Sequence, residues 1–365
     1  MTMKKRRFSG VLSLVLILSL LLCGCGSSGT TETKAPGVEL LAPETTPEPT
    51  PEPTPEPTPT PVIYRHPLTG EILEEPYGSA RPYAVMVNNI IYAQPQCGIS
   101  QADIIYEVLA EGGITRMMAI FSDLSDVPSL GSIRSIRSYY VDIAMSYDAI
   151  PIHAGGSYMS YTYMDQLGVR NIDGCIGDYN AFYRDSSRMT YGVEHSLFTT
   201  GERLLSYMDG LSDLRREHDG EFDYGLRFTE DAVPEGETAK SVTVTFTGGK
   251  TTGFTYNEET GLYSASQYGG AYYDGNTFGT LTFRNVIVLY ADTATIDGDG
   301  RLDVVLTSSG EGQYACGGSY TDISWSREGL YSPFSYEFAD GSEFEISAGT
   351  TYICIVPTGS TVTFE

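Results

Sequence analysis

The residues best suited to chemistry in this sequence are three arginines that lie close together in an acidic chain: Arg116, Arg134 and Arg137. The same stretch continues into a histidine and a glycine turn, formed by His153, Gly155, Gly156 and Ser157. Guanidinium groups bind carboxylates and phosphates through paired hydrogen bonds, and a glycine turn before a helix presents backbone N–H groups to an anion. These residues therefore predict a site for an anionic ligand, although the full phosphate-loop and dinucleotide-binding fingerprints are absent.

Two acids precede the arginines and offer a different chemistry. Residues 103–122 predict two strands joined by a tight turn at Gly112-Gly113. This pairing would place Glu107, Glu111 and Arg116 on one face, and a helix would also bring the two acids together. The set is either a structural ion-pair cluster or an arginine that acids hold toward a ligand. Glu107 and Glu111 are also candidates for acid/base catalysis.

The arginines need elements that position them, and residues 132–147 show the clearest helical pattern. Ser132 is a suitable N-cap, and apolar residues recur at helical spacing after it. Arg134 and Arg137 would then lie in the first turns, where cations oppose the helix dipole. A bound anion would explain this placement, and pairing with nearby acids is the alternative.

The glycine turn has a predicted strand before it and a predicted helix after it. The strand covers residues 149–153 and the helix residues 158–167. His153 at the strand end is a candidate general base or anion partner, with a buried structural role as the alternative. Residues 178–200 predict a long surface loop with two further basic candidates, Arg184 and Arg188. A helix capped by Thr200 follows.

The N-terminus predicts export and lipid attachment. A basic segment and an apolar run of about a dozen residues form a signal peptide over residues 1–24. The sequence Leu22-Cys23-Gly24-Cys25 resembles a bacterial lipobox, which makes Cys25 the expected lipidation site; an ordinary cleaved signal peptide is the alternative. Residues 25–61 are rich in Pro, Glu and Thr and predict a disordered tether. We therefore expect a protein anchored to the outer face of the cytoplasmic membrane.

Composition excludes several classes of partner and site. The 365 residues carry a formal net charge of −25, which argues against nucleic acid because phosphate backbones need a basic surface. The four cysteines that follow the expected lipidation site Cys25 show no zinc-ribbon spacing and leave disulfides open: Cys97, Cys175, Cys316 and Cys354. Asp297 to Gly300 resembles part of a calcium loop, but Ser308 stands at the twelfth position, so a hairpin turn is the better interpretation. We expect no cofactor and no metal.

The coarse pattern predicts an α+β protein. Residues 62–225 should form an N-terminal α/β domain with a mixed sheet, because strand and helix patterns alternate there. Residues 226–365 should form a smaller, mainly-β domain, because short apolar segments alternate with Gly, Asp and Ser turns. The only tryptophan, Trp325, is expected in the core or at a domain interface.

Several long segments resemble the YerB-like family of bacterial lipoproteins. In the N-terminal half these are RPYAVMVNN, SQADIIYEVLAEGGITRMMAIF, GSIRSIRSYYVDIAMSYDAIPIHAGGS and FYRDSSR; in the C-terminal half they are FRNVIVLY, IDGDGRLDVVLTSSGEGQYACGG, ISWSREG and TTYICIVP. The resemblance covers essentially everything after the tether. It implies two domains of unknown function and a lipid-anchored, exported protein, and it implies no reaction.

Three functions remain open on the sequence. The first is a binding module for an anionic or polyhydroxylated cell-envelope ligand, held by the arginines and the glycine turn. The second is an envelope transferase or hydrolase that acts on phosphate- or sugar-containing polymers, with Glu107, Glu111 or His153 as catalytic groups. The third is a scaffold whose tyrosine-rich surface binds another protein. No nucleophile elbow supports a serine enzyme.

Overall fold

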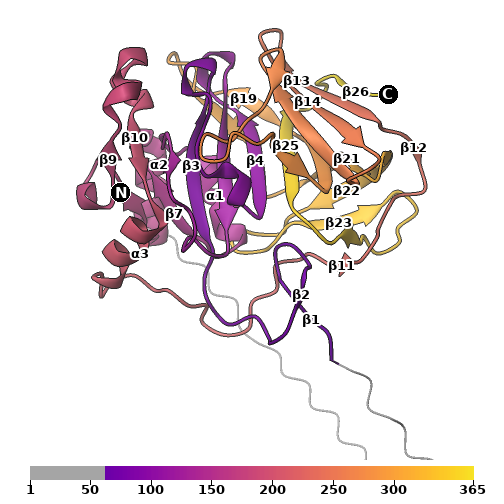
Figure 1. Ribbon diagram of the computed structural model, residues 1–365, viewed down its shortest axis with the longest axis horizontal. Helices are drawn as coiled ribbons and strands as arrows, with labels where there is room; N and C mark the ends of the chain where they lie inside the picture. The colour runs from indigo at the N-terminus through magenta and orange to yellow at the C-terminus, as the bar shows by residue number, and fades with distance from the viewer. Residues whose placement is uncertain (1–61) are drawn as a thin grey trace, which may run out of the picture. The chain divides into compact units, whose positions relative to one another are not determined.

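The computed structural model describes residues 62–365, which belong to one compact unit. The predicted signal peptide, the expected lipidation site Cys25 and the predicted tether lie outside the described residues. No helix among residues 62–365 combines the length and apolar character needed to cross a membrane. The α+β class is confirmed, since three α-helices accompany an extensive set of strands (Figure 1). The helices are α1 (Ser138–Ser146), α2 (Tyr158–Leu167) and α3 (Gly201–Asp209).

An eleven-stranded mixed sheet organises the described chain. Its order is β12-β22-β21-β18-β25-β4-β5-β3-β7-β8, with β23 paired to β22. The strands from the first half of the chain are β3 (Tyr83–Asn89), β4 (Ile104–Leu109), β5 (Thr115–Phe121), β7 (Ile150–His153) and β8 (Ile172–Asp173). Those from the second half are β12 (Glu237–Thr238), β18 (Asn285–Ala291), β21 (Ser309–Cys316), β22 (Ser319–Ser326), β23 (Ser335–Phe338) and β25 (Thr351–Pro357).

The two halves of the chain meet inside this sheet. Strand β25 pairs in parallel with β4, so that Cys354 lies beside Glu107 and Ile355 beside Val108. Hydrogen bonds therefore continue from one half to the other without a break. The domain boundary after residue 225 stays a prediction, but residues before and after it contribute strands to the same sheet.

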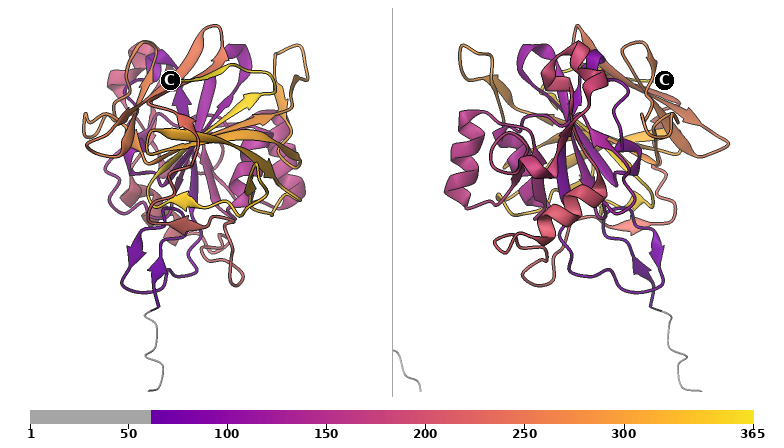
Figure 2. Two further views of the ribbon diagram at one scale, coloured as in Figure 1. Left: turned by 90° about the vertical axis from the view of Figure 1, so that its right-hand side faces the viewer. Right: turned by 60° about the vertical axis from the view of Figure 1, so that its left-hand side comes forward.

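Different layers cover the two faces of the sheet. Helices α1 and α2 pack on one face, where Tyr140 and Met164 join a buried cluster with Met86. A six-stranded sheet and α3 cover the other face, where Phe254 and Leu204 join a cluster with Val85. The right-hand view of Figure 2 shows magenta helices on one side of the indigo strands and orange strands on the other. The covering sheet contains β13 (Ser241–Thr247), β14 (Lys250–Asn257), β15 (Leu262–Gln267), β16 (Gly270–Ala271), β17 (Thr282–Phe283) and β26 (Val362–Phe364).

Short elements complete the fold. The remaining strands are β1 (Tyr64–Arg65), β2 (Ile72–Leu73), β6 (Leu130–Gly131), β9 (Tyr183–Arg184), β10 (Leu197–Thr199), β11 (Phe228–Thr229), β19 (Thr293–Thr295), β20 (Leu302–Val304) and β24 (Ile346–Ser347). The 3-10 turns are η1 (Ile91–Ala93), η2 (Ile99–Gln101), η3 (Glu111–Gly113), η4 (Tyr179–Ala181), η5 (Ser186–Tyr191) and η6 (Val193–His195). Strands β19 and β20 pair around Asp297, so the predicted hairpin is confirmed.

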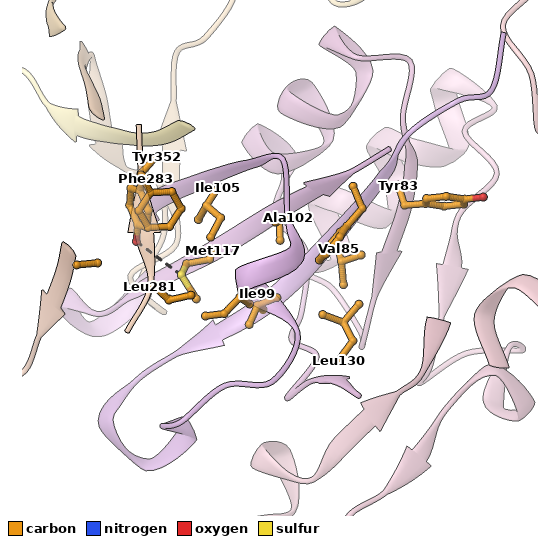
Figure 3. Packing of buried hydrophobic residues seen from close by; sticks show 14 of the residues in the cluster. Tyr83, Val85, Ile99, Ala102, Ile105, Met117, Leu130, Leu281, Phe283 and Tyr352 are labelled. Carbon is orange, nitrogen blue, oxygen red and sulfur yellow. Dashed lines mark hydrogen bonds between the residues drawn. The ribbon is translucent and has the colours of Figure 1, made fainter. Parts of the chain in front are cut away.

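Large aromatic side chains fill the space between the layers. The ring of Tyr352 lies edge-on to both Phe254 and Phe283, and its hydroxyl points toward the sulfur of Met117 (Figure 3). Trp325 is buried on the helix-covered face, as expected for a core residue. The four cysteines between residues 62 and 365 are free thiols.

Two local predictions were wrong. The helix begins at Ser138 and not near Ser132, because residues before it are extended: the N–H of Arg134 donates to Met86 O, and Ile136 N–H to Gly155 O. The pairing predicted for the hairpin, with Leu109 opposite Arg116, is also wrong by one residue: Val108 lies opposite Arg116, because two left-handed glycines and Ile114 lengthen the turn. Since neighbours along a strand face opposite ways, this shift changes which side chains can meet.

Candidate functional site

Most of the sequence-predicted site residues gather at one edge of the central sheet. Strands β3, β4, β7 and β8 run in the same direction, and their carboxyl ends share this edge. The segment before α1 crosses the edge beside the glycine turn, where Ser135 Oγ donates to Ala154 O over 2.9 Å. Ligands of open α/β sheets commonly bind outside the carboxyl ends of strands. The topology thus brings the arginines and the glycine turn together where a ligand site is expected.

Glu111 holds two of the three arginines. Its Oε2 accepts from Arg116 Nη2 at 3.2 Å and from Arg137 Nη2 at 3.0 Å, and its Oε1 accepts from Arg137 Nε. Burial by itself would raise the pKa of Glu111, but the hydrogen bonds from Arg137 and the charge of Arg116 outweigh it and lower that pKa. Glu111 is therefore a charged anchor for the pair.

The cluster keeps an excess of positive charge. Arg134 makes no side-chain hydrogen bond and no ion pair with any residue in the range 62–365, and its Nε is buried without a partner. The Nε of Arg116 is also buried and has no hydrogen-bond partner in the described part of the chain, in a residue that is 6% exposed. Burial, followed by the charge of Arg137, lowers the pKa of Arg116 to about 10. Unsatisfied buried donors are costly, and a bound anion would satisfy them.

Glu194 is the other carboxylate near this group of arginines. Burial lowers the pKa of Arg134, the charge of Glu194 raises it, and the charge of Arg137 lowers it further. Glu194 lies on an exposed turn, and its Oε1 is 3.7 Å from His195 Nε2. His195 is buried and contacts Asn88 over 2.8 Å. We define the arginine cluster as Glu111, Arg116, Arg134 and Arg137.

The glycine turn adopts the predicted strand–turn–helix form, but its polar groups have internal partners. The N–H of Gly155 donates to Asp173 Oδ1 over 2.8 Å, and Ser157 Oγ accepts from the N–H of Ser160 at the start of α2. Gly156 packs so closely that a Cβ there would lie 2.8 Å from Ser160 Oγ. The turn therefore supports the edge of the site more than it offers free donors.

His153 is fully buried at the end of β7. Its ring nitrogens contact Gly155 O at 2.9 Å and Asn171 Oδ1 at 3.1 Å. Burial lowers the pKa of His153, although the charge of Asp173 opposes the shift. Because the ring is fully buried and both of its nitrogens lie against oxygens of the protein, His153 stabilises the turn and has no path to a substrate in this conformation.

Arg184 and Arg188 lie in the 178–200 segment and make no hydrogen bond or ion pair with the arginine cluster. Arg188 donates to the carbonyls of Gln94 and Pro95 at 3.2 and 2.7 Å, which fixes this segment to η1. Arg184 donates to Val193 O and to Ser196 Oγ. Both guanidinium groups are therefore occupied by structural contacts.

Glu107 faces the opposite layer from Arg116. The one-residue shift in register places it beneath the six-stranded sheet, where it is 0% exposed. Its Oε1 contacts Asn89 Nδ2, Thr115 Oγ1 and Lys250 Nζ at 2.8, 2.6 and 2.9 Å. Its Oε2 accepts from Thr252 Oγ1 and Tyr352 OH at 2.8 and 2.7 Å. We call these residues with Glu107 the Glu107 network.

Sequence reasoning missed two groups of polar residues. Lys250 gave no signal, because a single lysine in a strand usually faces solvent, and only the tertiary structure shows that it is 2% exposed. Asp148 lies at the other edge of the sheet beside a cavity of about 550 Å³. It binds Arg215 at 2.6 Å and His218 at 2.8 Å. No group of residues within 62–365 has the composition and spacing of a metal site.

Two family models match the chain. Residues 68–213 match the N-terminal domain, and residues 242–353 the C-terminal domain, of "Protein of unknown function (DUF3048)". The chain is 31% identical to "Putative lipoprotein YerB" of Bacillus subtilis (strain 168) over 297 residues, which is 80% of this chain and 86% of the relative. The chain belongs to the YerB-like DUF3048 family. The matched regions contain the arginine cluster in the first domain and Lys250 in the second.

A solved structure supports the same assignment. The crystal structure of the YerB protein from Bacillus subtilis superposes with a TM-score of 0.70 at 27% sequence identity, over 82% of this chain and 99% of that one. The shared fold extends across both DUF3048 domains. The family carries no assigned reaction, so a function for this member must be argued from its own residues.

Proposed function

We propose that this protein is a lipid-anchored module that binds an anionic group of the cell envelope at the arginine cluster. Arg134 carries the argument, because its guanidinium makes no hydrogen bond or ion pair with residues 62–365 and its Nε is buried. Three cations and one carboxylate make the cluster positive in a chain whose net charge is −25. The local positive charge attracts a single anionic group, whereas the acidic remainder of the surface repels polyanions. A phosphate or carboxylate would bind both Arg134 and the free Nε of Arg116.

The place of the protein in the cell follows from the same family and from the N-terminus. The relative is named "Putative lipoprotein YerB", and the lipobox-like sequence ending in Cys25 supports the same attachment in this chain. We propose export and anchoring at the outer face of the cytoplasmic membrane. The residues suggested for catalysis favour binding over turnover, since Glu107 and His153 are buried and hydrogen-bonded to protein groups.

Thermal unfolding with a ligand panel tests the proposal. The panel contains phosphate, pyrophosphate, an isoprenoid phosphate and wall-polymer fragments, each with and without magnesium. A ligand at a hundred times its Kd stabilises the folded state by about 2.7 kcal/mol, which raises the Tm measurably. We expect a shift that Arg134→Ala removes. Arg227→Ala is the matched control, because Arg227 is half exposed and pairs with Asp223 away from the cluster.

The outcomes separate clearly. A shift that persists in Arg134→Ala would place the ligand elsewhere and contradict the proposal. No shift with any member of the panel, in a well-folded protein, would leave the arginines as structural groups and direct the search to protein partners.

A further inference from the structure

The Glu107 network brings together, in a buried place, the kinds of side chain that an acyl-transfer reaction needs. Lys250 supplies an amine, Asn89 a carboxamide and Glu107 a carboxylate, and these three side chains are 2%, 0% and 0% exposed. Thr115, Thr252 and Tyr352 complete the hydrogen bonds of the carboxylate. Complete burial of an ion pair seldom adds stability over well-packed apolar residues. The composition of the network therefore calls for a reason beyond charge pairing.

One oxygen contacts both nitrogens that such a reaction uses. Glu107 Oε1 lies 2.9 Å from Lys250 Nζ and accepts from Asn89 Nδ2 over 2.8 Å. It is therefore placed to take a proton from the attacking amine and to give one to the departing amide nitrogen.

Two donors point at the oxygen that would become negative. Gln96 Nε2 and Tyr272 OH donate to Asn89 Oδ1 over 3.4 and 3.5 Å. These distances are long in the unreacted arrangement, and attack at Cγ would place charge on Oδ1 and strengthen both bonds. Nucleophile, proton shuttle, leaving group and oxyanion donors thus meet in one buried place.

We propose that Lys250 and Asn89 form an intramolecular isopeptide bond, with Glu107 as the proton shuttle. Lys250 Nζ attacks Asn89 Cγ, the Nζ–Cγ bond forms, and the Cγ–Nδ2 bond breaks. The amide nitrogen leaves as ammonium after receiving two protons that Nζ loses, and Glu107 is a carboxylate before and after. The step needs no oxidant and no co-reactant. The folded chain holds the groups together, which replaces a bimolecular encounter by an intramolecular one.

The bond would join the two DUF3048 domains covalently. Asn89 ends β3 in the central sheet, and Lys250 begins β14 in the covering sheet. The side chains come from opposite layers, so the link would cross the apolar layer between the two sheets. A covalent link between residues far apart in sequence restricts the unfolded chain and resists separation of the layers.

Peptide mapping of the full chain by mass spectrometry tests the proposal. The purified protein is kept folded for several days, then unfolded and digested with trypsin. The expected product joins peptide 66–116 to peptide 241–284, with Lys250 uncleaved and a total mass lower by one ammonia molecule. Glu107→Gln should remove the product, because it removes the shuttle. Lys250→Arg should remove it as well, and it keeps a cation beside Glu107 so that the fold survives.

Each result of the peptide mapping either supports or overturns the proposed isopeptide bond. Separate wild-type peptides at full mass, with trypsin cutting after Lys250, would overturn the proposal and leave an ion pair. A linked peptide in the wild type that persists in Glu107→Gln would overturn the role of Glu107. A linked peptide that is present only in the wild type supports both.

Discussion

Glu107 and Glu111 are four residues apart in one hairpin, and their surroundings are opposite. Glu107 is buried between two sheets, and five protein groups satisfy its oxygens. Glu111 is partly exposed at the edge and faces more positive charge than it neutralises. The difference teaches where this fold can accept a ligand. A network that is complete within the protein has no donors left for a ligand, whereas the arginine cluster has unused ones.

The largest effect should come from breaking the complete network. Relative to protein in which Lys250 and Asn89 are not joined, replacing Lys250 by Met leaves the buried Glu107 carboxylate without its cation, and such a loss costs about 3–5 kcal/mol. Urea unfolding followed by fluorescence measures the change. The double variant with Glu107→Gln should recover part of the loss, because it removes the unpaired charge. A single variant as stable as the wild type would show that Glu107 is not a buried anion dependent on Lys250.

Asp148, at the edge of the central sheet opposite the arginine cluster, is another carboxylate that protein groups fully pair. Burial alone would raise its pKa, but hydrogen bonds from His218 and Arg215 lower the pKa to about 2 from the ordinary 3.8. A lowered pKa stabilises the fold at pH values above about 4, and this contribution of about 2 kcal/mol disappears as the pH falls toward 2. Asp148→Asn should remove it at pH 7. Urea unfolding of both proteins between pH 7 and pH 2 should converge at the acidic end; parallel curves would contradict the assignment.

Glu111 should show a smaller pH effect of the same sign. Its lowered pKa means that the stabilisation is present at neutral pH and is lost as the pH falls below the ordinary range for glutamate. Glu111→Gln should reduce stability by about 1–3 kcal/mol, because Arg116 and Arg137 lose their shared acceptor. Added phosphate should restore part of that loss if the cluster binds anions. Equal loss with and without phosphate would weaken the contrast with Glu107.

The smallest effect on stability should come from Arg134. Its side chain has no partner among the described residues, so Arg134→Ala should change the free energy of unfolding by no more than about 0.5 kcal/mol. The same change should abolish anion-dependent stabilisation. Calorimetric unfolding with and without phosphate measures both quantities on one sample. A large loss of stability in the absence of ligand would show that Arg134 is a structural residue.

Local sequence patterns predicted many elements but not their contacts. The strand–turn–helix around Gly155, helix α3 with its Thr200 cap and the hairpin around Asp297 follow from short-range periodicity and turn chemistry. The prediction for the start of α1 was wrong, because the residues before this helix form hydrogen bonds with distant backbone groups. Such long-range pairing overrides a local helical pattern.

The sequence by itself determined the α+β class, the family, and the group of arginines that make a local positive site, because these depend on residue types and near neighbours. Only the tertiary structure decided which arginine lacks a partner, which acid is buried, and that Lys250 reaches Glu107 from another layer. One residue of register placed Glu107 and Arg116 on opposite faces, and Glu111 lies beyond the strand in turn η3, beside Arg116. That choice rests on the turn geometry and on packing against strands far away in sequence, which no local pattern contains.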